Sequence, residues 1–278
     1  MIYINVRGTD AVAALKYKLT NDILFKMMFV QYPDLLKRLV AVLLGVRVED
    51  ITQFDISNPE MPPLTPKDKS CQLDIRMTVN GQVVDLEIQV NDEGDYPERS
   101  LFYWALGFAS SLPDAGKYAA LPRMIVVSIV AFKMFRCAEF HSEFALLEVK
   151  RHERLTDRMS LHYFELPKLP KTVGADDHLM YWLLLFKAKT EEELIKIEEK
   201  GGPIMAQAIE AYRHVSASNE FKELERIRKL ARHNEASALA NAERKTSIKI
   251  AKILKDVGID TDIITKSTGL TVDDILKL

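Results

Sequence analysis

The stretch that decides the fold is Gln72–Val90, QLDIRMTVNGQVVDLEIQV. It contains two runs with β-strand character, 72–79 and 82–90, on either side of Asn80-Gly81. Both residues of this dipeptide tolerate a positive φ, and Asn-Gly between two such runs is the strongest short-range signal for a tight β-hairpin. We therefore expect two antiparallel strands joined by a two-residue turn.

The two-residue turn also fixes the register of the hairpin. Counting outward from it places Arg76 opposite Asp85 and Asp74 opposite Glu87. Side chains alternate along a strand, so these four side chains share one polar face with Gln89, while the other face is apolar and belongs to the core. A solvated polar face explains the Arg76–Asp85 pair, which is an ordinary cross-strand ion pair.

The Asp74–Glu87 pair is harder to explain as a solvated surface. Two carboxylates with Cβ atoms about 5 Å apart repel each other by roughly 3 kcal/mol at an effective dielectric constant near 20. One of them can take up a proton, a cation can lie between them, or the pair can occupy a sheet edge without any function. A hard divalent cation such as Mg²⁺ suits paired carboxylate oxygens together with water and a substrate phosphate.

The segments around the hairpin predict an α+β fold. A helix is expected over 20–44, with a kink or break at Pro33 and an end at Gly45. A proline-rich loop over 58–70 precedes the hairpin. The remaining expected elements are strands over 50–56, 123–132 and 160–166 and a helix over 97–112.

Beyond Pro170 the sequence becomes helical. Thr190 and Glu193 have the spacing of a capping box at a helix start. Residues 220–256 contain more Lys and Arg than acids, which is typical of a solvated helix face. The last stretch resembles a small helix-turn-helix module that could bind DNA, contact a partner or dock on the core. We expect three regions: a core over 1–170, a helical extension over 171–236 and a helical tail over 237–278.

Composition excludes several classes of protein. The 278 residues are 47% hydrophobic, which is enough for a sizeable core and argues against intrinsic disorder. The net charge is only −2, so any site for a polyanion must be a local patch. Two cysteines, Cys71 and Cys137, exclude a disulfide framework and a Cys-rich zinc site. No signal-peptide pattern and no apolar run of ~20 residues is present, so we expect a cytoplasmic protein without membrane contact.

The six histidines lack the spacing of metal ligands. We expect His141, His152 and His162 to be structural or exposed. The sequence also contains no Ser-His or Cys-His pattern of a nucleophilic enzyme.

With the hairpin in place, a family resemblance becomes visible. Asp74 followed by Glu87-Ile88-Gln89 resembles the D…(D/E)-x-K core of the PD-(D/E)XK nuclease superfamily, with Gln89 at the usual Lys position. More narrowly, the chain is similar to the PD-(D/E)XK transposases of the Rpn recombination-promoting nuclease family. Further segments match in the same order: Thr20-Asn21-Asp22 with Phe25-Lys26 and Phe29, Asn58-Pro59-Glu60, Arg99 to Trp104, Phe164 to Lys168, Phe186 to Thr190, and Thr268 to Thr271.

This resemblance implies a restriction-endonuclease-like fold, with a mixed central sheet flanked by helices and followed here by a helical C-terminal region. It also implies Mg²⁺-dependent hydrolysis of double-stranded DNA, with Mn²⁺ as a substitute metal. Asp74 and Glu87 would hold the metal, and Gln89 would orient the attacking water. Asp22 would add a third carboxylate from the first helix, although an acid at a helix start is also favoured by the helix dipole.

Arg99 and Tyr103 are four residues apart on one helix face, so both could reach the same substrate groove. Arg99 could grip a phosphate or the carboxylate cluster. Alternatively, it could simply pair with Glu98 or Asp95.

The neutral Gln89 leaves a second class of function open. Gln can position water but cannot stabilise developing negative charge as Lys does. The alternative is therefore a catalytically silent nuclease-fold protein that acts as a DNA-binding or assembly module. Paired cuts in both DNA strands would favour a homodimer.

Overall fold

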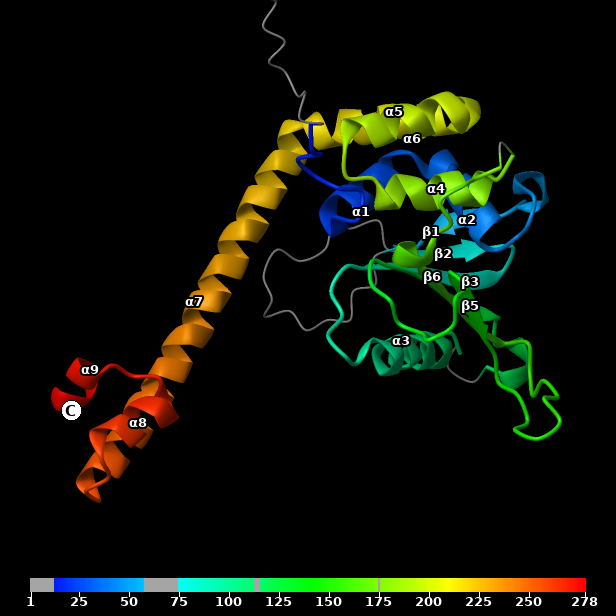
Figure 1. Ribbon diagram of the computed structural model, residues 1–278. Coiled ribbons are helices and arrows are strands. Elements are labelled where there is room, and N and C mark those ends of the chain that lie inside the picture. Colours follow the sequence, from blue (N-terminus) through cyan, green and yellow to red (C-terminus); the bar gives the residue numbers. More distant parts are fainter. Residues whose placement is uncertain (1–12, 58–74, 113–115, 175) are drawn as a thin grey trace, which may run out of the picture. The chain divides into compact units, whose positions relative to one another are not determined.

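The computed structural model describes residues 13–57, 75–112, 116–174 and 176–278 (Figure 1). The chain divides into two compact units. In the described residues, the first extends to Lys222 and contains the sheet, and the second comprises Glu223–Leu278. The boundaries of the three regions expected from the sequence remain a prediction.

A mixed sheet forms the centre of the first unit. In the described residues it has six strands in the order β1-β2-β3-β4-β6-β5. The neighbours β3, β4 and β6 run parallel, and the other neighbouring pairs are antiparallel. The strands are β1 (Phe54–Ile56), β2 (Ile75–Val79), β3 (Gln82–Gln89), β4 (Met124–Val130), β5 (His141–Phe144) and β6 (Met159–Glu165).

The hairpin of β2 and β3 has the predicted register. Arg76 pairs with Asp85, and Asn80 and Gly81 have φ values of 48° and 74°. The Asn80 side chain also accepts hydrogen bonds from the backbone N–H groups of Thr52 and Gln53, at 2.9 and 3.0 Å. These hydrogen bonds use the N–H groups of Thr52 and Gln53, which lie in the strand expected over 50–56. In the structure this strand is β1 and begins only at Phe54.

The expected first helix is two helices, α1 (Asp22–Gln31) and α2 (Pro33–Leu43). Pro33 lacks a backbone N–H and starts the second helix, so the predicted break is confirmed. Figure 1 shows α1, α2 and α4 (His178–Lys187) on one side of the sheet and α3 (Tyr96–Ser110) on the other. The next helices are α5 (Glu191–Lys200), which begins with the predicted capping box, and α6 (Gly202–Ala217).

The helix α3 packs closely on the sheet through Gly107. A Cβ at this position would clash with Met124 Cε and lie 2.6 Å from Arg76 Nη2. Met124 is fully buried in the cluster between α3 and the sheet, so it has little room to move. A side chain at Gly107 would therefore have to displace the ends of the Met124 and Arg76 side chains.

Two short helices pack against the end of a long one in the second unit. They are α8 (Thr261–Thr268) and α9 (Val272–Leu276), and the long helix is α7 (Asn219–Asp256). Arg244 forms an ion pair with Asp274 at 2.9 Å, and Lys255 donates to the Ile275 carbonyl at 3.0 Å. These contacts hold α9 on α7, and DNA binding by this tail stays a prediction. No helix in the described part of the chain could span a membrane.

The edge strand β5, which the sequence did not predict, brings two histidines together. His141 Nε2 lies 3.1 Å from His162 Nδ1, and His162 Nε2 lies 2.9 Å from Ser160 Oγ. Ser160 in turn donates to Glu143 at 3.0 Å. Burial lowers the pKa of His162 to about 4, against the opposing effect of Glu143. The expectation of a structural histidine is therefore confirmed for His162, which is buried.

Gly107→Ala is expected to lower the free energy of unfolding by about 1–2 kcal/mol, because overpacking outweighs the gain of about 1 kcal/mol in helix propensity. Chemical denaturation checks this. Gly174→Ala is the control, since a Cβ there meets nothing within 4 Å and stability should be equal or slightly higher. Equal stability of the two variants would show that α3 does not need the close approach.

Acid should destabilise the first unit through His162. Its pKa is about 6.5 when unfolded and about 4 when folded. Between these values the unfolded chain binds the proton and the folded chain does not, so stability is lost as the pH falls through this window. In His162→Gln the slope of unfolding free energy against pH should be shallower by up to about 1.4 kcal/mol per pH unit.

Denaturation series between pH 7 and about 4.5 measure this slope. His178→Gln serves as the control because His178 is exposed. A slope in His162→Gln that equals the wild-type slope would exclude His162 as the acid-sensitive group.

Candidate functional site

The candidate site lies where the parallel strands β3, β4 and β6 end. In the sheet register Glu87 of β3 pairs with Ser128 of β4, which in turn pairs with Tyr163 of β6. Paired residues point to the same face of a sheet. This face is the one that α3 covers, because Tyr96 of α3 hydrogen-bonds to Ser128. The carboxyl ends of parallel strands are where α/β sheets usually bind ligands.

Four buried hydroxyl groups, those of Tyr96, Ser100, Ser128 and Tyr163, lie beside Glu87 on this face and form two hydrogen-bonded pairs, which we call the hydroxyl ladder. The Tyr96 hydroxyl donates to Ser128 Oγ at 2.9 Å, and Ser100 Oγ lies 2.5 Å from the Tyr163 hydroxyl. Burial raises the pKa of Tyr163, so its hydroxyl keeps its proton at neutral pH. Because buried polar groups must be hydrogen-bonded, these pairs fix α3 over the strand ends. The ladder gives the site a rigid polar support.

Glu87 itself is only 9% exposed. Carboxylates are seldom this buried unless cations or hydrogen-bond donors accompany them. Arg76 is near enough for Glu87 to contribute to the raised pKa of the guanidinium, although the hydrogen bond with Asp85 is the larger cause. Glu87 is thus a nearly buried carboxylate near the carboxyl end of a central strand.

Asp85 has a different role from Glu87, although both are acids on the same face. It is fully buried, and Arg76 donates to both of its oxygens, from Nε at 2.7 Å and from Nη2 at 2.9 Å. Burial raises the pKa of Asp85, and the Arg76 guanidinium opposes this shift. The predicted cross-strand pair is thus confirmed, and it uses the Asp85 carboxylate for structure.

Gln89 is half-buried and lies two residues beyond Glu87, so its side chain is on the same face. Its Nε2 donates to the Asn91 carbonyl at 2.8 Å. This bond orients the amide, whose Oε1 is the group that can accept a hydrogen bond from water. Gln89 is therefore held in one orientation near Glu87.

The remaining predicted site residues lie near the starts of two helices, α1 and α3. Asp22 is the first residue of α1, is half-buried and accepts a hydrogen bond from the Ile23 N–H at 3.0 Å. Near the start of α3, Arg99 pairs with Glu93 at 2.8 Å. The partner is therefore neither Glu98 nor Asp95. Tyr103 follows Arg99 by one helical turn, as predicted, and is half-buried.

Arg99 also stacks on an aromatic ring at the start of α3. Its guanidinium carbon lies 5.1 Å from the centre of the Tyr96 ring, a cation–π contact. In the described part of the chain its buried Nε has no hydrogen-bond partner. Arg99 is thus held at the N-terminal end of α3.

Asp74 lies outside the described residues, so its pairing with Glu87 stays a prediction, and Asn58-Pro59-Glu60 lies outside them too. Within the described ranges, no group of three or more His, Cys, Asp or Glu side chains is arranged to hold a metal. Asp74 and Glu87 both carry carboxylate oxygens, the kind of ligand that a hard divalent cation prefers.

The hydroxyl ladder was not predicted from the sequence. Ser128 is the one polar residue in the apolar strand Met124–Val130, and this isolated position in the sequence was a signal for a buried hydrogen bond. The contributions of Tyr96, Ser100 and Tyr163 depend on how α3 lies across the sheet, which no local pattern indicates.

Comparison with known proteins identifies the family. No curated protein and no solved structure matches the chain. Residues 19–242 match the family model described as PD-(D/E)XK nuclease family transposase. That range includes the hairpin, the buried Glu87 and the covering helix α3. Since the match spans most of the chain, the protein belongs to the PD-(D/E)XK nuclease family of transposases, and the mixed sheet fits the restriction-endonuclease-like fold of that family.

Proposed function

We propose that the protein is a metal-dependent DNA endonuclease that hydrolyses phosphodiester bonds during recombination or transposition. The observation that carries this proposal is the buried Glu87 at the end of β3, with Gln89 on the same face. Family membership supports a nuclease and hence a nucleic-acid substrate. Double-stranded DNA is the substrate we infer, and a homodimer would suit paired cuts.

In this proposal Asp74 and Glu87 hold the divalent cation, Mg²⁺ or Mn²⁺. When bound, such a cation lowers the pKa of a coordinated water and polarises the scissile phosphate. Glu87 is held in place by its strand and by the packing of α3, so it needs little reorganisation when it binds a ligand. Asp22 is the candidate for a third carboxylate.

Gln89 has the role of orienting the attacking water through its Oε1. Its hydrogen bond to the Asn91 carbonyl already fixes the amide, so no rotamer must be selected during the reaction. Arg99 and Tyr103 are proposed to contact the substrate. The Arg99 side chain is 27% exposed, so the outer part of its guanidinium can donate to a phosphate oxygen.

The alternative function is a silent nuclease-fold protein that binds DNA or assembles with partners. The specific observation in its favour is the neutral Gln89, whose amide is already hydrogen-bonded within the chain. A silent scaffold should show neither stabilisation by Mg²⁺ or Mn²⁺ nor cleavage with either metal.

Glu87→Gln and Asp74→Asn are each expected to lower Mg²⁺-dependent nicking of supercoiled plasmid by at least about 100-fold, because each removes a charged ligand with little change in shape. Nicking rates with Mg²⁺ and with EDTA measure the effect. Asp55→Asn, which alters an exposed acid on β1, should keep the wild-type rate.

Circular dichroism and thermal unfolding must show that both site variants remain folded. Metal-dependent nicking at the same rate by wild type and both variants would contradict the proposal that these two residues hold the metal.

A further inference from the structure

The outer face of α3 is apolar although it is exposed. Five exposed side chains on this face follow helical spacing, and they are Leu101, Phe102, Ala105, Leu106 and Ala109. We call these five residues the α3 stripe. The exposed fractions of its three large residues are 46%, 55% and 46%, in chain order. The opposite side of α3 carries the buried residues that pack on the sheet.

A helix at the surface of a protein normally carries charged side chains on its outer face. The sequence of α3 contains no Lys, Arg, Asp or Glu from Ser100 to Ser110. A helix that is apolar all round is normally covered on all sides, but Figure 1 shows no other labelled helix of the first unit on this side of the sheet. A contiguous apolar patch of this kind marks an interaction surface, whereas single exposed apolar residues do not.

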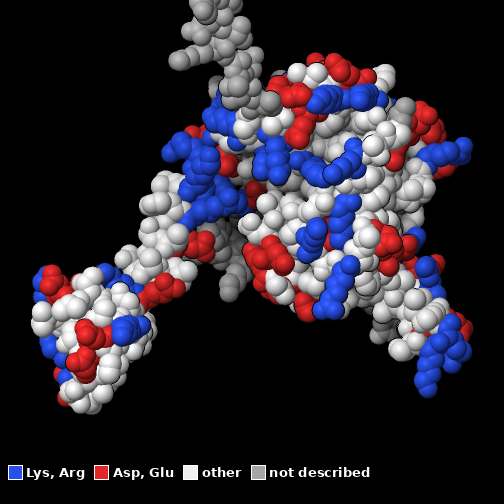
Figure 2. Space-filling model, in the orientation of Figure 1, with Lys and Arg blue, Asp and Glu red and all other residues white. Residues whose placement is uncertain are grey.

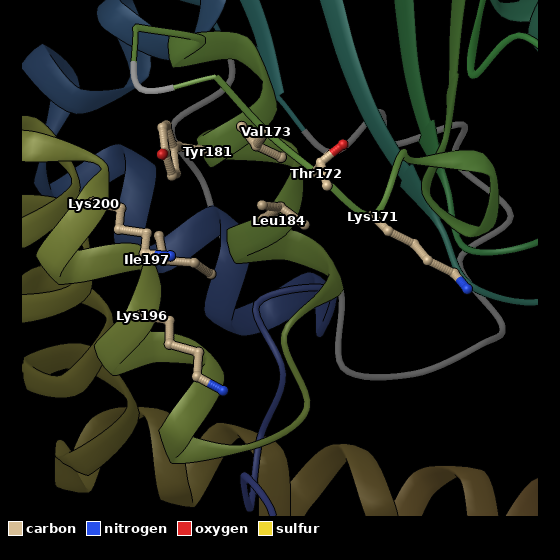
Figure 3. A pocket seen from close by; sticks show the side chains of 8 residues that line it. All are labelled: Lys171, Thr172, Val173, Tyr181, Leu184, Lys196, Ile197 and Lys200. Atoms are coloured by element: carbon tan, nitrogen blue, oxygen red, sulfur yellow. The ribbon is translucent and has the colours of Figure 1, made fainter.

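The charge of other surfaces limits what could cover the α3 stripe. Figure 2 shows charged side chains of both signs over much of the visible face of the first unit. The hollow beside α4 and α5 is likewise lined by lysines, namely Lys171, Lys196 and Lys200 (Figure 3). Burying such charges against the α3 stripe would cost free energy, because the stripe offers them no ion-pair partner. The matching surface must therefore be uncharged and apolar, and a second copy of the chain presents one in its own α3 stripe.

The sizes of the side chains make the α3 stripe complementary to itself. Phe102 and Ala105 are three residues apart and lie near the middle line of the stripe. If two copies pack antiparallel about a two-fold axis level with residues 103 and 104, Phe102 of each copy lies opposite Ala105 of the other. A large side chain opposite a small one lets two helices interdigitate closely. In the same register Ala109 lies opposite Glu98 of the other copy, which is exposed and can keep its carboxylate in water.

We propose that the α3 stripe is the interface of a homodimer, in which α3 packs antiparallel against α3 of a second copy. The inference names the surface through which two copies associate, and it does not depend on the proposed cleavage of DNA. One helix face provides less than the about 800 Å² that each partner contributes to a standard interface, so we expect a weak and reversible dimer.

The test is sedimentation of the full-length protein at concentrations from about 1 to about 200 μM, a range that detects a dissociation constant in the micromolar range. The mass of wild type should rise with concentration from 31.7 kDa toward twice that value. The variant Phe102→Glu/Ala105→Glu places carboxylates opposite each other across the interface. Its dissociation constant should be at least about 100-fold higher than that of wild type.

Two further variants make the test specific. The matched control Val149→Glu/Leu155→Glu adds the same two charges at exposed apolar positions outside α3, and it should keep the wild-type dissociation constant. The variant Phe102→Lys/Ala105→Lys should be as monomeric as its Glu counterpart. A mixture of the Glu and Lys variants at low salt should associate at least about tenfold more tightly than either variant alone, because the antiparallel register pairs opposite charges.

Circular dichroism must show that all three variants keep the helix content of wild type. A wild type that stays monomeric at about 200 μM would overturn the inference, and so would equal association of wild type and the Glu variant of α3. A mixture that associates no better than its separate components would contradict the antiparallel packing. Plasmid nicking with Mg²⁺ is measured separately, so a monomeric wild type that nicks would leave the proposed function standing, and a dimer that does not nick would leave the interface standing.

Discussion

The turn at Asn80-Gly81 is the constraint on which the site depends. Its two positive φ angles close the hairpin with two residues, and this fixes the register of β2 against β3. A shift by one residue would move every side chain of β3 to the other face. Glu87 would then enter the apolar core, and the row of polar residues beside α3 would be lost.

The residues of the polar face divide into two groups according to their hydrogen-bond partners. Asp85 is paired by both of its oxygens with Arg76, and Ser128 is bound by Tyr96, so these groups fix the strands and α3 in place. Glu87 follows Asp85 on the same face of β3 and pairs with Ser128 of β4, and its carboxylate is nearly buried. Such a rigid surround is what a site requires when it must hold a cation and a phosphate in a defined geometry.

The predictable features were those encoded locally. The turn dipeptide fixed the hairpin register, Pro33 the helix break, and Thr190 with Glu193 the capping box. The edge strand β5 was missed because its four residues, His141–Phe144, lack an apolar pattern and form a strand by pairing with β6. The pairing of Arg99 with Glu93 was missed for the same reason: the loop before α3 determines it, and helix spacing does not.

The central claim is that Glu87 is a ligand of a divalent cation, and calorimetric titration with Mn²⁺ tests it most directly. The measurement reads metal binding alone, so it is independent of whether Gln89 supports rapid cleavage. The account predicts saturable binding by wild type and a loss of affinity of at least about tenfold in Glu87→Gln. Equal Mn²⁺ affinity of the two proteins, or no binding by wild type, would contradict it.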